Sequence, residues 1–479
     1  MRELTVTGSD ILEKSAAEMA ALVRSRQVSP VELVEASLRR IRAINGRLNG
    51  FCLVLEEEAM NAARKAEADV MEGRPLGALH GVPVAIKDLT PTRGHRTTSG
   101  SLAYKDFVAP DNAAIAQSLI DAGAILVGKT TTPEFAYSGF TESRIFGKTR
   151  NPWNPSRTSG GSSGGSGVAV ATRCVPIAEG SDMGGSVRIP ASCCGITGLK
   201  PSHGRIPFTI LRSGFERLAH FGPLARTVDD VALFLKVTQG PNELDPLSNP
   251  VPITFPASLE RDPRSLRVAL CSDLGFFSLD PEVERNTHDM ADRLRQAGAV
   301  VEDVDIGWSF DGILAWDRQW NVYLAAHYGH LLETHRDELD PEVVRLIEKG
   351  LRTKAVDLKQ TEFVATEMWR KLAAIHAQYD VMICPTLARP VPSVDLSERS
   401  NPGSWTEDGR YTGTTMTVLF NLVSMCPVMS VPSGFTSDGL PTGLQIVGRR
   451  FDDLTVLQVG KILEDSWGSG GFGRPPLEG

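Results

Sequence analysis

The sequence lacks several features that would place it in a specialised class of protein. No apolar run approaches the roughly eighteen residues that a membrane-spanning helix needs, so we expect no membrane association. The opening residues MRELTVTGSDILEK contain no apolar core of the kind found in secretory signals. The seven cysteines are scattered and form no CxxC pair, which argues against a zinc ribbon and against a disulfide framework. Together these absences predict a cytoplasmic protein with reduced thiols.

The sequence also lacks an excess of basic charge, since its 50 Lys and Arg residues are outnumbered by 58 Asp and Glu residues. The formal net charge is −8, and acidic and basic residues are interspersed along the chain. A nucleic-acid-binding surface normally needs a cluster of Lys and Arg, so we expect no nucleic-acid partner. Instead, 41% of the 479 residues are hydrophobic and 23% are charged, a balance that is typical of folded globular proteins. The length allows one large α/β domain or two to three smaller ones.

Helical and strand patterns alternate along the chain. Ser29-Pro30-Val31-Glu32 is typical of a capping box, and the helix that it starts is expected to end at Asn45-Gly46. A short apolar strand at 82–86, a helix at 112–122 and a strand at 124–127 predict a βαβ unit and a mainly parallel sheet. Similar patterns predict helices at 56–73 and 361–378, and strands at 381–386 and 428–432.

Two motifs match known functional patterns, but their context argues against both functions. Residues 123–130, GAILVGKT, fit the phosphate-binding pattern GxxxxGK[ST]. Because the four variable positions favour a strand interior and Pro133 prevents an immediate helix, we expect no nucleotide site. The three histidines of NVYLAAHYGHLLETH have no glutamate in the register of an HExxH zinc motif, so we expect no metal site there. These histidines are His327, His330 and His335.

The most unusual segment is SGGSSGGSG at residues 159–167, where every residue is serine or glycine. Taken alone, this composition is typical of a flexible linker. However, a second cluster follows at Gly184-Gly185-Ser186, and the apolar stretch between the clusters predicts a buried helix and a buried strand. Glycines before a serine let successive N–H groups converge on a ligand, as an oxyanion hole requires. The two clusters therefore indicate a nucleophilic serine site rather than a linker.

A serine nucleophile needs a proton acceptor. Histidine is the usual acceptor, yet none of the nine histidines, His203 and His220 included, lies in a recognisable partner motif. A lysine can serve instead when burial brings it to its neutral form. Lys87, at the end of the strand at 82–86, is the candidate base, and a surface lysine at a strand end is the alternative interpretation.

Several ordered segments together resemble the amidase signature family. They are GVPVAIKDL (81–89), GKTTTPEFAYSGFTES (128–143), NPWNPSRTSGGSSGGSGVAVA (151–171) and GSDMGGSVRIPASCCGITGLKPS (180–202), with VPSGF and GLQIVG nearer the C-terminus. The resemblance covers most of residues 8–465. It implies an α/β fold, namely a single large domain over residues 1–479 with a central mixed, mainly parallel β-sheet covered by helices on both faces. Its parts would be an N-terminal helical segment (1–75), a signature core (81–205) and a loose tail (466–479).

The resemblance also implies a serine–serine–lysine catalytic triad. Ser186 would be the nucleophile, Ser162 the bridging serine that follows a cis peptide bond, and Lys87 the general base. The backbone N–H groups of Met183, Gly184 and Gly185 would form the oxyanion hole. Ser163, Asp182 and Arg188 would support the site. For Asp182 and Arg188, a solvated ion pair at the surface is the alternative interpretation. Such a reaction needs no metal and no cofactor.

The family also includes the glutamine-hydrolysing subunit of a tRNA-dependent amidotransferase, which holds the charged ends of glutamine with an arginine and an aspartate. Ala365 and Thr414 stand near those places, and neither can neutralise a buried charge. We therefore expect a hydrolase of small uncharged amides, with carbamates and esters also accessible, and keep the glutaminase as the alternative. A homodimer is left open. Tyr137 is expected to line the acyl channel, and the other aromatic candidates are Phe208, Trp316, Trp320 and Tyr323.

Overall fold

The computed structural model describes residues 11–397, 403–468 and 471–476. Within these ranges the chain forms one eleven-stranded sheet, in the order β1-β3-β2-β6-β8-β7-β12-β13-β11-β9-β10, and a separate two-stranded ribbon, β4-β5. The strands are β1 (Phe51–Val54), β2 (Pro83–Lys87), β3 (Ile125–Thr130), β4 (Glu142–Ser143), β5 (Gly147–Lys148), β6 (Ile177–Asp182), β7 (Thr197–Lys200), β8 (His220–Ala225), β9 (Arg267–Leu270), β10 (Val300–Asp303), β11 (Val381–Pro385), β12 (Val428–Phe435) and β13 (Pro441–Gly448). A large mixed sheet is thus confirmed.

Parallel pairing occurs in two blocks of this sheet. Strands β3, β2 and β6 pair in parallel in one half, and β11, β9 and β10 do so in the other. Antiparallel pairs through β8, β7, β12 and β13 join the two blocks. The βαβ unit predicted from the sequence is confirmed, because β2 and β3 pair in parallel and the helix α4 (Ala114–Asp121) lies between them in the chain.

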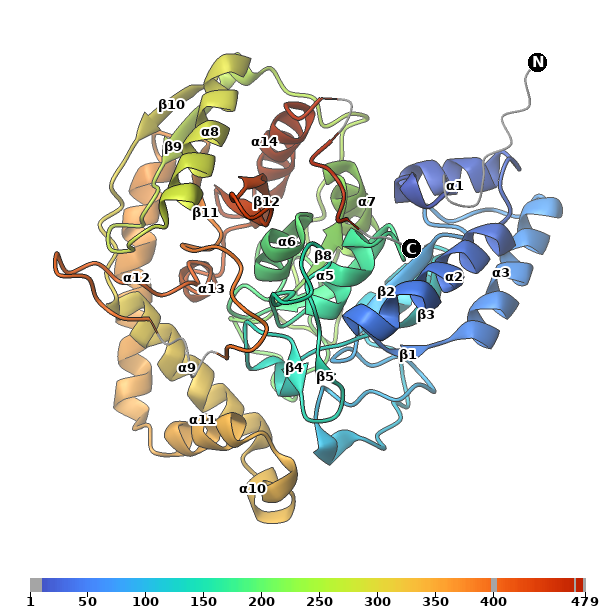
Figure 1. The fold of residues 1–479 in the computed structure, drawn as a ribbon, viewed down its shortest axis with the longest axis horizontal. Helices are drawn as coiled ribbons and strands as arrows, with labels where there is room; N and C mark the ends of the chain where they lie inside the picture. The colour runs from blue at the N-terminus through green and yellow to red at the C-terminus, as the bar shows by residue number, and fades with distance from the viewer. Residues whose placement is uncertain (1–10, 398–402, 469–470, 477–479) are drawn as a thin grey trace.

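Helices cover both faces of the sheet, as expected. Besides α4 they are α1 (Ala16–Arg24), α2 (Pro30–Leu48), α3 (Glu56–Met71), α5 (Gly164–Ala171), α6 (Arg188–Cys194), α7 (Val228–Thr238), α8 (Pro281–Ala297), α9 (Asp311–Tyr328), α10 (Leu331–Thr334), α11 (Pro341–Leu351), α12 (Ala355–His376), α13 (Leu419–Leu422) and α14 (Asp453–Asp465). Short 3₁₀ helices are η1 (Ile11–Glu13), η2 (Leu102–Tyr104), η3 (Glu134–Ala136), η4 (Pro263–Ser265) and η5 (Arg336–Glu338). In Figure 1, α1 to α3 lie at one end of the molecule and α9 to α12 at the other, with α5 and α6 between them.

The hydrophobic cores follow the alternation of side chains along the strands. Val84 and Ile86 point into one core, which α1, α4, α7, α8 and α14 help to form, whereas Ala85 points to the opposite face, under α2, α3, α5 and α6. In the other half of the sheet, Met382 contributes to a third core with α9, α12 and α13. One face therefore carries a continuous core, and the other face carries two.

Local sequence signals predicted the N-terminal region well, with one error. The Ser29 hydroxyl accepts a hydrogen bond from the Val31 N–H, and the Glu32 carboxylate accepts one from the Ser29 N–H, as in a capping box. The expected end of this helix at Asn45-Gly46 is wrong, because α2 continues to Leu48 and closes on Asn49 in the left-handed conformation. Asparagine tolerates that conformation better than most residues, so it can take the place of a terminal glycine.

The C-terminal tail is better anchored than expected. Residues 469–470 and 477–479 of the predicted loose tail lie outside the described residues. Between them, the Phe472 ring stacks on Phe435 at 4.4 Å and packs edge-on against Trp153 and Trp467. Aromatic burial of this kind offsets the entropy of ordering a glycine-rich segment.

Among the described residues, no helix combines the length and the apolarity needed to cross a membrane.

The parallel pairing of β2 and β6 positions the candidate site. Their carboxyl ends lie at the same edge of the sheet, and these ends are Lys87 and Asp182. Ser162 lies in the loop before α5, and Ser186 lies in the loop before α6. Both loops reach this edge of the sheet, because Ser162 contacts Lys87 and the Ser163 backbone bonds to that of Ser186. The Gly/Ser run is thus the start of a buried helix, and the linker interpretation is wrong.

Candidate active site

Lys87 is the centre of the site, and its side chain is fully buried. Its Nζ lies 2.6 Å from the Ser162 Oγ and 2.9 Å from the Ser181 Oγ. The peptide bond between Gly161 and Ser162 is cis, as the resemblance implied. The alternative interpretation of Lys87 as a surface residue is therefore wrong, because the lysine is enclosed and contacts two hydroxyl groups.

The surroundings of Lys87 make its neutral form accessible near neutral pH. Burial lowers the pKa of Lys87 to about 7, although the negative charges of Glu179 and Asp182 act in the opposite direction. Burial likewise raises the pKa of Glu179 to about 7. The Glu179 carboxylate accepts hydrogen bonds from the Lys87 backbone N–H at 2.9 Å and from the Thr90 hydroxyl at 3.0 Å. This carboxylate therefore holds the end of β2 in place and contributes, together with Asp182, to the negative charge near the lysine.

The two serine loops are joined directly by their backbones. The Ser163 N–H donates to the Ser186 carbonyl at 3.1 Å, and the Ser163 Oγ contacts the Ser181 backbone at 3.3 Å. Ser162 is fully buried, while 9% of Ser186 remains exposed, at the floor of a cavity. The structure thus brings Lys87, Ser162 and Ser186 to one edge of the sheet, with only the serine expected to be the nucleophile open to the cavity.

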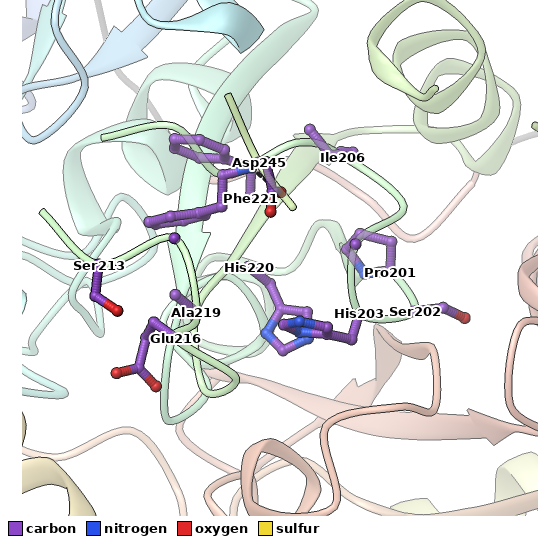
Figure 2. Close-up of a pocket in the computed structure, with 13 residues that line it drawn as sticks. Pro201, Ser202, His203, Ile206, Ser213, Glu216, Ala219, His220, Phe221 and Asp245 are labelled. Atoms are coloured by element: carbon purple, nitrogen blue, oxygen red, sulfur yellow. Dashed lines mark hydrogen bonds between the residues drawn. The ribbon is translucent and has the colours of Figure 1, made fainter. Parts of the chain in front are cut away.

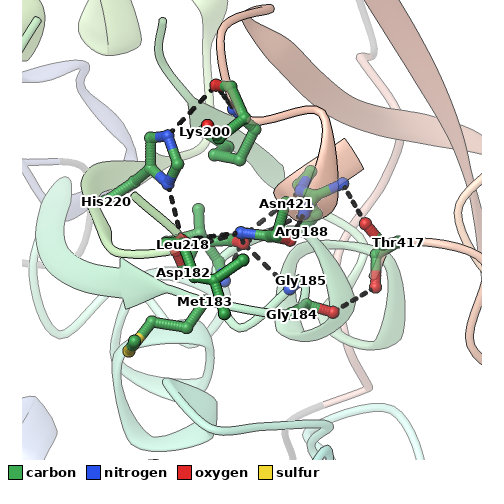
Figure 3. Close-up of polar contacts among 12 residues, drawn as sticks. Asp182, Met183, Gly184, Gly185, Arg188, Lys200, Leu218, His220, Thr417 and Asn421 are labelled. Atoms are coloured by element: carbon green, nitrogen blue, oxygen red, sulfur yellow. Dashed lines mark hydrogen bonds and ion pairs between the residues drawn. The ribbon is translucent and has the colours of Figure 1, made fainter. Parts of the chain in front are cut away.

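Asp182 and Arg188 form a buried ion pair that supports the Ser186 loop (Figure 3). The guanidinium donates to the Asp182 carboxylate through Nε at 3.1 Å and Nη2 at 2.9 Å. Burial alone would raise the pKa of Asp182, but the charge and hydrogen bonds of Arg188 hold it well below its usual value. The same carboxylate accepts the backbone N–H groups of Gly185 and Val187, on either side of Ser186. The solvated-pair alternative is therefore wrong, since both side chains are fully buried.

The glycine loop before Ser186 is held through its carbonyl groups (Figure 3). The Thr417 hydroxyl donates to the Gly184 carbonyl at 2.6 Å. The Trp316 indole Nε1, which Figure 3 does not label, donates to the Met183 carbonyl at 2.8 Å. The Gly185 N–H, expected in the oxyanion hole, instead donates to Asp182 at 2.8 Å. In the described chain, the Met183 and Gly184 N–H groups have no protein acceptor. These two amides can serve a developing oxyanion.

A cavity of about 460 Å³ lies above Ser186. Tyr137, Trp316 and Trp320 line it, as expected. Thr414, which the sequence placed near a position that holds a charged end of glutamine in the glutaminase, also lines it. Three other predicted neighbours lie elsewhere: Phe208 borders a small cavity near His203, and Tyr323 and Ala365 border a separate cavity of about 530 Å³ beside α9 and α12. The placement of Ala365 at the substrate site is therefore wrong, because its side chain leaves α12 toward that second cavity.

The histidines lie outside the cavity above Ser186. His203 and His220 pack edge to face at 5.3 Å around a void of about 10 Å³ (Figure 2). His327 lies in the last turn of α9, and His330 and His335 flank α10. Among the described residues, no group of three or more His, Cys, Asp or Glu is arranged to hold a metal ion. The GAILVGKT segment forms β3 through Thr130, so its backbone lacks the open loop that a phosphate site requires.

Several residues of the site escaped the sequence analysis. Ser181 and Glu179 lie on β6, within or beside a segment that carries the family resemblance, so their position at a strand end was a usable signal. Asn421 donates to the Asp182 carboxylate at 2.9 Å, and Gln445 accepts from Arg188 at 2.7 Å. Both lie more than two hundred residues along the chain from their partners, and no local pattern marks them.

Comparisons with known proteins show the family of this chain. A family model described as Amidase matches residues 32–457. The chain is 37% identical over 456 residues to an acylamidase of Rhodococcus erythropolis, covering 94% of each protein. It is 34% identical to a glutamyl-tRNA(Gln) amidotransferase subunit of Chloroflexus aurantiacus, covering 92% of this chain and 94% of that protein. A solved bacterial aryl acylamidase of the amidase signature family matches with a TM-score of 0.88 and 31% identity, over 95% of this chain and 96% of that one.

Fold and relatives together define an enzyme that hydrolyses amides. The chain belongs to the amidase family, as its motifs indicated.

Proposed function

We propose that this protein hydrolyses small uncharged amides through an acyl-enzyme on Ser186. Neutral Lys87 accepts a proton from Ser162, which accepts one from Ser186 as its Oγ attacks the amide carbon. The Met183 and Gly184 N–H groups stabilise the oxyanion. Ser162 then returns the proton to the leaving amine, and water releases the acid by the reverse relay. The observation that carries this proposal is the 2.6 Å contact between the buried Lys87 Nζ and the Ser162 Oγ.

The cavity lining supports an uncharged substrate. Its walls are largely apolar, and the charged side chains that border it are already paired. Arg345 forms an ion pair with Glu342, and Asp317 forms one with Lys349. A zwitterionic substrate would have to compete with these pairs or leave its own charges unpaired, which is costly in a partly buried site.

Hydrolysis of a small panel of substrates tests this function, followed by amine or ammonia release and, for the ester, by alcohol release. The panel holds an acyl-anilide, an aliphatic amide, a carbamate, an ester and free glutamine, each with wild type and Ser186→Ala in the presence of EDTA. We expect wild type to release amine from an uncharged amide regardless of the chelator, and the variant to lose this activity by about a thousandfold or more. Unchanged turnover by the variant would refute the assignment of Ser186, and loss on EDTA treatment would refute a metal-independent reaction.

A glutamine-hydrolysing function is the second candidate, because the chain is 34% identical to a glutamyl-tRNA(Gln) amidotransferase subunit over most of its length. It would require glutamine as the preferred substrate of the panel, and an accessory chain or tRNA to raise the rate. Ammonia released from glutamine, with no amine from the uncharged amides, would favour this candidate over the first.

A further inference from the structure

Trp316 connects the wall of the cavity to the peptide that precedes the Ser186 loop. It lies on α9, 133 residues along the chain from Met183, and its indole Nε1 donates to the Met183 carbonyl at 2.8 Å. Its ring also covers Gly184 so closely that a Cβ at that position would lie 2.6 Å from the Trp316 Cζ2. One side chain therefore both binds this peptide group and packs against the residue that follows it.

The hydrogen bond to the Met183 carbonyl also acts on the neighbouring amide of Gly184. The carbonyl of Met183 and the N–H of Gly184 belong to one peptide group, which is trans, since the cis bond of the described chain lies at Gly161. In a trans peptide the C=O and N–H point in opposite directions, so an indole that holds the carbonyl also fixes the direction of the N–H. The next peptide is held differently, because Thr417 binds the Gly184 carbonyl and Asp182 binds the Gly185 N–H.

We infer that Trp316 is a positioning residue for amide hydrolysis, and that it orients the Gly184 N–H toward the oxyanion. This inference rests on the proposed function. The Gly184 amide has no acceptor among the described residues, so without the indole its direction would depend on a flexible glycine backbone. Preorganised donors are effective because they need no reorientation when charge develops on the oxygen. Trp316 therefore acts on the transition state through Gly184.

Trp320 provides a matched control on the same helix. Its ring stacks on that of Trp316, with centroids 5.9 Å apart and planes 11° apart, and it lines the same cavity. Its indole Nε1 is buried but has no hydrogen-bond partner in the described part of the chain. Replacing either tryptophan by phenylalanine removes an indole N–H and reduces the ring by a similar amount. Only the change at Trp316 removes a hydrogen bond to the glycine loop.

The test compares Trp316→Phe with Trp320→Phe in steady-state hydrolysis of the amide that wild type cleaves best. We expect Trp316→Phe to lower kcat about ten- to a hundredfold while KM changes less than about threefold, because the bond matters chiefly in the transition state. Trp320 also lines the cavity, so we expect Trp320→Phe to change KM, while kcat falls by less than about threefold because no hydrogen bond to the glycine loop is lost. The Ser186 Oγ can add to the carbonyl carbon of a trifluoromethyl ketone analogue of that amide and form a tetrahedral oxyanion. This analogue should bind Trp316→Phe more weakly than wild type, in proportion to the loss in kcat.

A second variant separates the hydrogen bond from ring packing and from folding. A tryptophan analogue with sulfur in place of the indole N–H, incorporated at position 316, keeps the ring shape and removes the donor. It should reproduce the loss in kcat with an unchanged thermal unfolding midpoint. A normal kcat in this protein, or an effect on KM alone, would overturn the inference. That result would leave the proposed function intact, whereas activity in Ser186→Ala would refute the function itself.

Discussion

The buried ion pair between Asp182 and Arg188 makes the most quantitative prediction. Asp182→Asn keeps the shape of the side chain but removes its charge, and it places an amide NH₂ group against donors. The native carboxylate accepts two hydrogen bonds from the guanidinium, one from the Asn421 amide, and one each from the Gly185 and Val187 backbones. The substitution therefore removes acceptors for several buried donors and leaves a buried guanidinium without its counter-ion.

The expected loss of stability follows from this geometry. At the observed separation of 2.9 Å, and with an effective dielectric constant of about 20, the attraction between the two charges is about 6 kcal/mol. Breaking one side of a buried pair typically costs about 3–5 kcal/mol. We expect the lower range, because Arg188 keeps its hydrogen bonds to the Thr417 carbonyl and to Gln445. Activity should also fall at least a hundredfold, since the carboxylate holds the backbone on both sides of Ser186.

Urea unfolding followed by tryptophan fluorescence measures this loss, with Glu302→Gln as the matched control. Glu302 forms an ion pair of similar length, 2.8 Å, with Arg267, but both side chains are about half exposed. Exposed pairs contribute little, so the control should unfold with the wild-type midpoint and keep full activity. If Asp182→Asn were as stable and as active as the control, our account of the Ser186 loop would be refuted.

Three further predictions concern protonation and the glycine loop. Because burial lowers the pKa of Lys87 to about 7 and only the neutral amine can accept a proton, kcat/KM should rise with pH through about 7 and then level off. The charge of Glu179 raises that pKa, so Glu179→Gln should move the midpoint of the pH profile to lower pH; a midpoint that stays in place or moves upward would contradict this role. Gly185→Ala should lower kcat at least a hundredfold, because φ is +116° and the new methyl group would overlap Thr417. Gly46→Ala, whose methyl group would have no neighbour within 4 Å, should keep wild-type activity. If Gly46→Ala and Gly185→Ala lowered kcat equally, the overlap with Thr417 could not be the cause of the loss.

The features that the sequence predicted depend on neighbours in the chain. The capping box at Ser29 and the βαβ unit from β2 to β3 involve residues whose spacing decides their structure. Lys87 and the two glycine–serine clusters were found in the same way, because strand ends and glycine loops leave a local pattern. The family resemblance then assigned roles to these residues, including the cis peptide that the structure contains at Ser162.

The features that the sequence did not predict depend on contacts between distant segments. The Trp316 indole binds a carbonyl 133 positions away, and Asn421 binds an aspartate 239 positions away. Such partners are selected by how helices such as α9 pack on the sheet, and many tryptophan or asparagine positions would have matched the local pattern equally well. Ala365 was misplaced for the same reason, since its position in the chain does not fix the direction in which its side chain leaves α12.

The measurement that tests the central claim most directly is the capture of the acyl-enzyme. Wild-type protein is mixed with an activated acyl ester, quenched in acid within milliseconds to seconds, and examined by intact mass and peptide mass spectrometry. The proposed mechanism predicts a single added acyl group on the peptide that contains Ser186, absent from Ser186→Ala and accumulating more slowly in Lys87→Met. An acyl group on any other residue, or full turnover with no covalent adduct at any quench time, would contradict it.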